Sequence, residues 1–453
     1  MQEGGDDMVM PTERQPAGVS AVRTKQAGEI RSGWDWVERT VWTDRMLESL
    51  ERGVKGGVWF SLIDKVVRSQ TLYAAWVQVK KNKGGAGSDH QDLESFENRL
   101  AENLRQLEEE LRGGCYHPRP IRRVYIDKPG SKEKRPLGIP AVRDRVVQAA
   151  LRLVIEPIFE REFMPRSYGF RPGRGCKDAL REVDSYLKAG YGYVVDADLK
   201  AYFDSIPHDE LMGEVKTRIA DGRVLELLGM FMKQQVLEDM RLWTPEKGTP
   251  QGAVISPLLA NLYLHSVDKT MAEAGHIMVR YADDFVVLCR TRTEAEQAFA
   301  LVGSLVQDKG LILHPVKTRL VDTTQPGEGF DFLGYRFENG TRRPRKKSLD
   351  ALKDSIREKT GRSSGNSLET IISRVNMTTQ GWFVYFKHSN WKTFRPIDGW
   401  IRRRLRSILR KREHRKGMSR GWDNIHWPNT FFRDHGLFSL AAAHELELQS
   451  LHR

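Results

Sequence analysis

The N-terminal quarter of the chain repeats its apolar residues at three- and four-residue spacing, which predicts amphipathic helices. The pattern runs through WDWVERTVWTDRMLESLERGV (34–54) and ESFENRLAENLRQLEEELRGG (94–114), and the basic glycine-rich stretch KKNKGGAGSD (80–89) lies between them. The same spacing returns in AVRDRVVQAALRLVIEPIFEREF (141–163). We therefore expect helices on both sides of a glycine-rich loop, and a further helix after residue 140.

Other parts of the chain are rich in β-branched and aromatic residues, which predicts strands. IRRVYIDKPGSKEKRPLGIP (121–140) is typical of a β-hairpin that turns at Pro129 and Gly130. Strands are also expected in three apolar runs: YGYVVDADL (191–199), HIMVR (276–280) and FVVLCR (285–290). After Phe337 the chain becomes rich in Arg, Lys and Trp at helical spacing, which indicates a separate helical region.

Composition narrows the classes of function. A chain of 453 residues exceeds one ordinary domain, and its 39% apolar residues suffice for packed cores. Lys and Arg outnumber Asp and Glu by 73 to 60, which gives a net charge of +13. A polyanionic partner is expected, nucleic acid first and an acidic membrane surface second. The alternative is that the basic surface only keeps the protein in solution.

Cysteines and apolar runs argue against several other classes. The three cysteines, Cys115, Cys176 and Cys289, form no C-x-x-C pair, which argues against a disulfide framework or a cysteine zinc site and fits a reducing cytoplasm. No run approaches the roughly 18 apolar residues that span a bilayer. Residues 1–30 contain no apolar signal region and are predicted to be a disordered tail. We therefore expect a nucleic-acid partner and no membrane.

Acidic residues at the strand ends are the candidate chemistry. Asp283 and Asp284 fall at the tip of a predicted hairpin, where an ordinary solvated loop would also tolerate them. Asp196 and Asp198 lie two residues apart, and so on one face of a strand. If the two acidic ends lie side by side, their oxygens form the kind of site that Mg²⁺ binds. Two such ions can clamp the oxygens of a phosphoryl displacement.

These residues carry a family resemblance. Tyr281-Ala282-Asp283-Asp284 resembles the Y-x-D-D signature of reverse transcriptases, and Asp198 with Phe203 five residues later resembles their other catalytic strand. From about residue 55 to the C-terminus, further blocks follow in the family's order: 135–140, Asp144-Arg145, 167–174, 248–252, Ser256-Pro257-Leu258 with Asn261, Gly310 with Lys317-Thr318, and Phe332-Leu333-Gly334.

Two features resemble one branch, the group II intron-encoded proteins, which are bacterial reverse transcriptase/maturases. One is GFRPGRG (169–175) together with RPLGIP (135–140) and VRDR (142–145). The other is the later region, where 381–386 and 398–406 resemble the maturase X domain and 427–440 resembles the family's tail. Many members also carry a His-Asn-His endonuclease with cysteine pairs. Because no cysteine follows Cys289, we expect that domain to be absent.

The resemblance implies an α+β fold. It is a right-hand polymerase whose fingers and palm combine an antiparallel palm sheet with helices, followed by a helical thumb, the maturase X domain. We place the domain limits at 1–30 for the disordered tail, 31–340 for fingers and palm, 341–417 for the thumb, and 418–453 for a C-terminal maturase tail.

The resemblance also implies a function: a cytoplasmic, bacterial RNA-directed DNA polymerase that binds its group II intron RNA to assist splicing and intron mobility (retrohoming). Its partners are then the intron RNA, an RNA template, a DNA primer or target, and dNTPs, with the oligomeric state left open. Three alternatives stay open: a defence-associated or domesticated reverse transcriptase without an intron partner, a non-polymerising RNA-binding splicing factor, and RNA-dependent RNA synthesis.

The family's catalytic roles carry over to matching positions. Asp198, Asp283 and Asp284 are expected to coordinate two Mg²⁺ ions, with Asp284 the less direct ligand. Asp196 and Asp204 are interpreted as strand-end or helix-capping residues. The expected nucleotide-binding residues are Lys128 and Arg135 on the triphosphate, Phe203 as steric gate, Gln251 beside the nascent pair, and Lys317. The alternatives are ordinary surface charge for the basic residues and core packing for Phe203.

Basic residues crowd one short stretch of the later region, which suits a surface that binds phosphates. The RNA-binding candidates are Arg402, Arg403, Arg404, Arg406, Arg410 and Lys411. Trp382, Trp391 and Trp400 either stack on bases or pack in the helical core. Core packing is the preferred interpretation for most of them.

Overall fold

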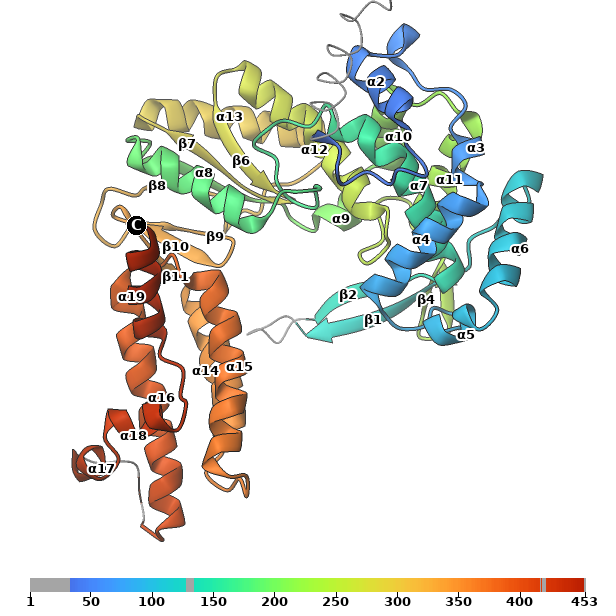
Figure 1. Cartoon of the computed structure of the whole chain (residues 1–453). Coiled ribbons are helices and arrows are strands. Elements are labelled where there is room, and N and C mark those ends of the chain that lie inside the picture. Colours follow the sequence, from blue (N-terminus) through green and yellow to red (C-terminus); the bar gives the residue numbers. More distant parts are fainter. Residues whose placement is uncertain (1–32, 128–133, 416, 418–420, 452–453) are drawn as a thin grey trace, which may run out of the picture. The chain divides into compact units, whose positions relative to one another are not determined.

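The computed structural model describes residues 33–127, 134–415, 417 and 421–451, which form two compact units (Figure 1). One unit combines the described residues up to Arg119 with Pro140–Glu162 and Met212–Phe231. The other combines Pro120–Ile139, Phe163–Leu211 and the chain from Met232 onward. Within these described residues, no helix has the length and apolar character needed to span a bilayer.

The first unit is built from helices around α7 (Val142–Glu160), which buries residues on most of its circumference. A helix buried on most sides is surrounded by other elements, and α3 (Ile63–Val66), α4 (Ser69–Asn82) and α6 (Leu100–Gly113) contact it. Helices α6 and α7 confirm those predicted at 94–114 and 141–163, whereas of the helix predicted at 34–54 only α2 (Asp44–Arg52) is present, because residues 34–43 form turns. Further helices here are α5 (Leu93–Glu97) and α11 (Gly222–Met232), and α10 (His208–Lys216) has residues in both units.

The second unit contains the palm sheet, in the order β6-β7-β3-β8 with every pairing antiparallel. Its strands are β3 (Tyr193–Asp198), β6 (Ile277–Tyr281), β7 (Asp284–Cys289) and β8 (Arg319–Asp322). The helices that contact this sheet are α8 (Cys176–Lys188), α12 (Ser256–Glu273) and α13 (Arg292–Asp308), as Figure 1 shows in green and yellow. The predicted antiparallel sheet with helices is confirmed, and so are its three apolar strands.

A second sheet carries the predicted hairpin. Strand β1 (Ile121–Asp127) pairs antiparallel with β2 (Lys134–Ile139), which confirms the hairpin, while the predicted turn at Pro129 and Gly130 lies outside the described residues. β1 also pairs with β4 (Val236–Glu238), and β4 forms a small hairpin with β5 (Arg241–Trp243). The sequence pattern missed β4 and β5 because strands of three residues show no alternation.

A third sheet links the palm sequence to the helical region. It consists of β9 (Phe330–Phe332), β10 (Tyr335–Glu338) and β11 (Thr341–Pro344), in the order β11-β10-β9. Phe330, Phe332 and Phe337 belong to the same apolar core as the palm strands and α8. The Tyr335 hydroxyl donates to the Tyr385 carbonyl at 2.7 Å. This bond ties the sheet to α15 (Leu368–Phe386), the second helix of the thumb.

The helical region predicted after Phe337 is present. Helices α14, α15, α16 and α19 lie alongside one another (Figure 1, orange to red). Their apolar core includes Phe394, Ile401, Leu405 and Ile408, which follow one another on one face of α16. The region contains α14 (Lys346–Lys359), α15 (Leu368–Phe386), the short 3₁₀ turn Trp391–Thr393, α16 (Phe394–Arg412), α17 (Gly421–His426), α18 (Asn429–Asp434) and α19 (Leu440–Leu451).

Candidate active site

Two strands and a turn bring the predicted catalytic aspartates to one end of the palm sheet. Asp198 is the last residue of β3, Asp284 is the first of β7, and the two stand opposite each other in the antiparallel register. Asp283 belongs to the two-residue turn between β6 and β7, in which Ala282 adopts a positive φ of 59°. The structure thus gathers Asp198, Asp283 and Asp284, although they come from segments far apart in sequence.

The environment of this cluster disfavours its negative charge. Burial, followed by repulsion from Asp196, Asp283 and Asp198, raises the pKa of Asp284 to about 7. Burial and then the charge of Asp198 likewise raise the pKa of Asp283, against the opposing effect of Arg135 and Lys317. Four carboxyl groups within one low-dielectric site cannot all ionise at little cost. The site therefore favours a protonated carboxyl or a bound cation.

Two basic side chains beside the cluster come from the segment that includes β8. The Lys317 ammonium stands 2.7 Å from Asp198 Oδ2, whereas the sequence had placed Lys317 only among nucleotide-binding residues. Arg319 stands 3.5 Å from Asp196 Oδ2 and opposite Asp196 in the sheet register. Asp196 is thus neither a strand-end nor a capping residue: it lies inside β3 with a cross-strand partner. Burial still raises the pKa of Asp196 to about 6.

The donor set of this cluster fits a divalent cation. Carboxylate oxygens are the ligands that hard cations take, and a bound cation would offset the repulsion that raises the pKa of Asp283 and Asp284. In the described part of the chain, no three acidic, histidine or cysteine side chains are already spaced as a metal cage. A small rearrangement of carboxylate side chains would accompany binding.

A buried ion pair supports the turn from behind. Arg280 of β6 and Asp268 of α12 are both nearly inaccessible to solvent, and their side chains bond directly, with Arg280 Nε donating to Asp268 Oδ1 at 2.7 Å. The same guanidinium donates to the Ala282 carbonyl at 2.9 Å and to Asn261 Oδ1 at 3.0 Å. Arg280 thereby connects α12 to the backbone of the turn. Sequence reasoning missed this pair, although an arginine inside an apolar strand is a signal that could have revealed it.

A second segment packs directly on the turn. The Asn261 amide donates to the Gly169 carbonyl at 2.6 Å, and the Tyr168 backbone nitrogen donates to the Arg280 carbonyl at 2.9 Å. A Cβ atom on Gly169 would stand 2.2 Å from the backbone nitrogen of Ala282. Only glycine permits this approach, so the block 167–174 acts here as a support of the catalytic turn.

The expected nucleotide-binding residues that follow β3 lie close together. Phe203 sits half-buried in the short helix α9 (Tyr202–Ser205), and its carbonyl accepts a hydrogen bond from the Thr249 backbone nitrogen at 2.7 Å. The Gln251 amide donates to Asp204 Oδ2 at 3.4 Å. Asp204 is exposed and caps no helix in the described part of the chain, contrary to the capping interpretation. Block 248–252 and α9 are thus bonded to each other.

The hairpin β1–β2 packs against the same block. The Gly138 backbone nitrogen donates to the Gln251 carbonyl at 2.6 Å, and a Cβ atom on Gly252 would stand 2.3 Å from the Gly138 carbonyl oxygen. Arg135 is exposed on β2, and its charge is felt at Asp283, whose pKa it lowers. Lys128 lies outside the described residues. Arg135 is therefore close enough to act on Asp283, and its hairpin is bonded to the block that contains Gln251.

The sequence predicts one phosphate-binding surface for the basic stretch of α16, but several of its side chains bond within the protein instead. Arg406 is buried and donates to the Trp427 carbonyl at 2.9 Å, and Arg410 contacts both carboxylate oxygens of the buried Asp423 at 3.1 Å. Arg404 donates to Thr360 Oγ1 at 2.6 Å, and Lys411 donates to Ser363 Oγ at 2.9 Å.

These contacts fasten the C-terminal segment and the α14–α15 loop to α16. Asp398 adds to them, since it accepts hydrogen bonds from the Leu440 and Ala441 backbone nitrogens at 3.0 and 3.1 Å. In the part of the chain that the structure describes, Arg402 and Arg403 have no such side-chain bond. Of the predicted RNA-binding residues, these two are therefore the best placed to meet a phosphate.

The tryptophans of this region also divide. Trp382 packs between the palm core and the thumb core, with its ring centroid 4.6 Å from that of Phe386, and Trp400 packs partly against the thumb core. Trp391, by contrast, is 53% exposed. Core packing is therefore confirmed for Trp382 and Trp400 and does not hold for Trp391.

An antiparallel palm sheet that ends in converging aspartates defines the class of right-hand nucleic-acid polymerases. Comparison with known proteins agrees. Residues 126–337 match the family model described as reverse transcriptase (RNA-dependent DNA polymerase), and residues 349–426 match that of the group II intron, maturase-specific domain. The chain therefore belongs to the reverse transcriptases, in the group II intron-encoded branch, which confirms the resemblance.

Individual relatives support this assignment. The group II intron-encoded protein LtrA of Lactococcus lactis subsp. cremoris is 37% identical over 212 residues, which cover 47% of this chain and 35% of LtrA. Protein YkfC of Escherichia coli K12 is 35% identical over 292 residues, 55% of this chain and 75% of YkfC. The match thus spans about a third of LtrA and three quarters of YkfC. A solved Cas6-RT-Cas1–Cas2 complex aligns with a TM-score of 0.36 at 24% identity over 55% of this chain and 41% of that chain, a likeness too weak to bear on the assignment.

The family assignment carries two coarse consequences. A reverse transcriptase domain implies a polymerase that depends on divalent metal ions, which agrees with the carboxylate donor set. A maturase-specific domain implies an RNA partner, which agrees with the net charge of +13. The expected absence of an endonuclease and the domain limits stay predictions.

Proposed function

We propose that the chain is an RNA-directed DNA polymerase that extends a DNA primer along an RNA template with dNTPs. The observation that carries the proposal is the convergence of Asp198, Asp283 and Asp284 at one end of the palm sheet. Their own repulsion and burial, expressed in the raised pKa of Asp283 and Asp284, leave this site short of positive charge. A polymerase site needs such uncompensated negative charge, because it must bind divalent metal ions together with the substrate.

The three aspartates would hold two Mg²⁺ ions, with Asp198 and Asp283 as the direct ligands. When bound, such ions lower the pKa of a primer 3′-hydroxyl and neutralise the triphosphate and leaving pyrophosphate. Arg280 and Gly169 hold the turn that carries Asp283, so the carboxylate is oriented before substrate arrives. Lys317 pairs with Asp198 in the structure, and it would have to give up that contact for Asp198 to hold a cation.

Further residues of the site would select and orient the nucleotide. Arg135 and Lys128 bind the triphosphate, for which a guanidinium suits paired contacts to phosphate oxygens. Phe203, supported by the hydrogen bond of its carbonyl with Thr249, acts as the steric gate that excludes a 2′-hydroxyl. Gln251 would lie beside the nascent base pair. The Gly138 backbone nitrogen holds its carbonyl, and Asp204 holds its side chain.

We also propose that the natural RNA partner is a group II intron, whose splicing and mobility the protein assists in the bacterial cytoplasm. The support is the maturase-specific match over residues 349–426 and the names of relatives such as LtrA. Arg402 and Arg403, which have no side-chain bond within the described residues, supply a surface for its phosphates. A defence-associated or domesticated enzyme without an intron is the alternative.

Primer extension tests the polymerase directly. Purified protein is incubated with an RNA template, a DNA primer, Mg²⁺ and dNTPs, beside Asp283→Ala and the matched control Asp308→Ala, an exposed aspartate of α13. Extension by the wild type and the control, with loss to background in Asp283→Ala, supports the proposal. A folded, RNA-binding wild type that extends nothing would overturn it in favour of a splicing factor. Faster use of ribonucleotides than of dNTPs would instead indicate RNA synthesis.

A further inference from the structure

A groove in the thumb lies apart from the aspartate cluster and from the contacts that fasten α16. Its volume is about 840 Å³, and it is bounded by β11, α14, the turn Trp391–Thr393 and the first turns of α16. Pro344, Leu349, Ile397 and Trp400 provide an apolar floor. Gly399 contributes no side chain there, which keeps the groove open.

The charge of the groove has one sign. Among the described residues that line it are Arg343, Lys353, Lys392 and Arg403, and none is an aspartate or a glutamate. Arg343 is paired with Glu338 at 2.6 Å, whereas Lys353 and Arg403 have no ion-pair partner within the described residues. The guanidinium carbons of Arg357, which is paired with Asp354, and of Arg404 lie 5.7 and 5.5 Å from the Trp400 ring centroid. Such a groove complements an anion that also carries an apolar surface.

An exposed tryptophan stands at the rim of this groove. Trp391 belongs to the turn whose other residues line it, and 53% of Trp391 is accessible. Lys392 and Arg395 lie near its ring, at 5.7 and 5.8 Å from the centroid. An exposed aromatic ring between cations is the arrangement on which unpaired bases stack, while the cations meet the neighbouring phosphates.

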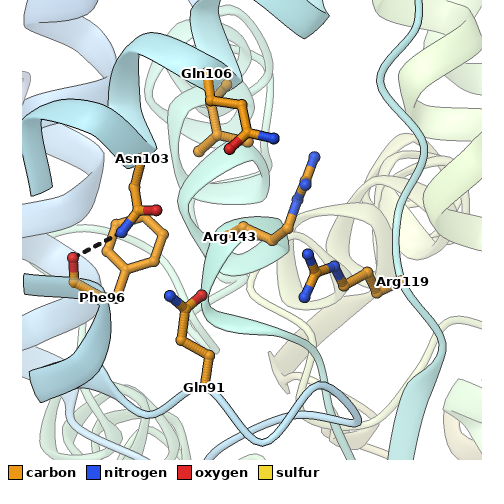
Figure 2. A pocket seen from close by; sticks show the side chains of 7 residues that line it. Gln91, Phe96, Asn103, Gln106, Arg119 and Arg143 are labelled. Carbon is orange, nitrogen blue, oxygen red and sulfur yellow. Dashed lines mark hydrogen bonds between the residues drawn. The ribbon is translucent and has the colours of Figure 1, made fainter. Parts of the chain in front are cut away.

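The polar pocket of the first unit differs from this groove in its charge. It measures about 270 Å³, and Figure 2 shows Arg119 and Arg143 among amide side chains such as Asn103, which donates to the Phe96 carbonyl. Arg119 is paired with Asp89 at 2.7 Å, and Arg143 is paired with Glu110. Because both guanidinium groups are already neutralised, this pocket has no charge to spare for a phosphate.

We propose that the thumb groove binds a single-stranded segment of RNA, with one base stacked on Trp391 and the adjoining phosphates on Lys353, Lys392 and Arg403. RNA is favoured over DNA because Thr393 and Asn390 line the groove, and the Thr393 hydroxyl and the Asn390 side-chain nitrogen are groups to which a 2′-hydroxyl can bond. A duplex is disfavoured, because its bases are stacked on each other and cannot reach Trp391. The inference rests on the proposed RNA partnership, which it deepens, and does not depend on polymerisation.

The test measures binding of the full-length protein to a labelled single-stranded RNA of about 12 nucleotides by fluorescence anisotropy, without dNTPs or divalent metal. Trp391→Ala is expected to weaken binding about tenfold, and Trp391→Phe to stay close to the wild type. The matched control is Trp422→Ala, because Trp422 is 51% exposed, lies 4.3 Å from the Arg415 guanidinium carbon, and is absent from the groove. That control is expected to change affinity less than about twofold.

The salt dependence of the same binding tests the cations. Lys353→Ala with Arg403→Ala is expected to lower the slope of log affinity against log salt by about 0.7 for each phosphate that is no longer neutralised. Arg374→Ala, an exposed arginine of α15 outside the groove, controls for net charge and is expected to change the slope less. Thermal unfolding of each variant verifies that the thumb stays folded.

Several outcomes would overturn the proposal that the groove binds single-stranded RNA. Decreases in affinity for Trp391→Ala and the double variant that are no larger than in their controls would show that binding is diffuse. Equal affinity for single-stranded DNA would overturn the choice of RNA, and stronger binding of duplex would overturn stacking. Because the assay contains no polymerisation step, any of these results leaves the primer-extension test of the aspartates untouched.

Discussion

The palm cluster and helix α16 both concentrate charge of one sign, and they use it in opposite ways. In the palm, Asp196 and Asp198 of β3 converge with Asp283 and Asp284 at the β6–β7 turn, and burial, followed by repulsion from the neighbouring carboxylates, raises the pKa of Asp284 to about 7. In α16, most of the basic side chains are compensated within the thumb itself, as Arg406 and Arg410 are by Trp427 and Asp423.

Charge in a sequence therefore does not predict binding by itself. A site for an external ligand needs charge that the fold leaves unpaired, and a run of like charges does not guarantee it. The arginines of α16 look in sequence like a phosphate surface, but their long side chains reach carbonyls and carboxylates of neighbouring segments. Within the described residues, the four aspartates at the sheet end pair with two basic side chains, Lys317 and Arg319, so part of their charge stays uncompensated.

Breaking the palm's buried ion pair should produce the largest effect. Asp268→Ala leaves the Arg280 guanidinium buried without its carboxylate, which costs about 3–5 kcal/mol of the free energy of unfolding. Because Arg280 also bonds the Ala282 carbonyl, the catalytic turn shifts, and primer extension should fall at least about a hundredfold. Denaturant unfolding and extension assays measure the two effects.

The double variant Asp268→Leu with Arg280→Met separates stability from position. It removes both charges, so most of the stability should return, while extension stays low because the turn has lost its hydrogen bond. Full recovery of extension in this variant would show that the pair only stabilises the fold and does not position the turn.

The corresponding change in the thumb should have a smaller effect, and it should lower stability without lowering primer extension. Arg410→Met removes the two hydrogen bonds to Asp423 and leaves that buried carboxylate with Arg415 at 3.9 Å, which lowers the free energy of unfolding by about 2 kcal/mol. Extension on a preformed primer–template should stay within about threefold of the wild type at a temperature where both are folded. A decrease in RNA binding with unchanged stability would instead assign Arg410 to the RNA surface.

The position of the candidate aspartates at the strand ends was predictable from sequence because the signals are local. Alternation along β3 and the short turn between β6 and β7 place Asp198 and Asp283 at strand ends without knowledge of the rest of the fold. The antiparallel sheet was implied by the family resemblance. The α+β class and the helical thumb followed from periodicity and from the family's blocks.

The sequence could not predict ion pairs between residues that are far apart in the chain. Arg410 meets Asp423 across a turn of the thumb, and Lys317 meets Asp198 from 119 residues away. No local pattern distinguishes such side chains from solvated ones. The strands β9, β10 and β11 were missed for another reason: with three or four residues each, they are too short to show a period.

The palm carboxylates also predict a dependence of stability on pH. The pKa of Asp284 lies at about 7 in the folded protein and near 3.8 when unfolded, so the folded state binds the proton more tightly. The stability that this proton contributes is complete below pH 3.8 and is lost as pH rises through about 7. In EDTA, Asp284→Asn should therefore unfold at a higher temperature than the wild type at about pH 8 and at a similar temperature at about pH 4. Equal melting temperatures under the alkaline condition would mean that the cluster is not short of positive charge.

The smallest effect is expected from Lys317, and it decides whether the contrast between palm and thumb holds. Its side chain is 59% exposed, so its ion pair with Asp198 is screened by solvent and contributes at most about 1 kcal/mol. Lys317→Met should thus change the melting temperature less than Arg410→Met does, measured side by side without divalent metal. A decrease as large as that of Arg410→Met would mean that Asp198 already has a structural counter-ion. The palm would then resemble α16, with its charge committed inside the fold and not held for a metal and substrate.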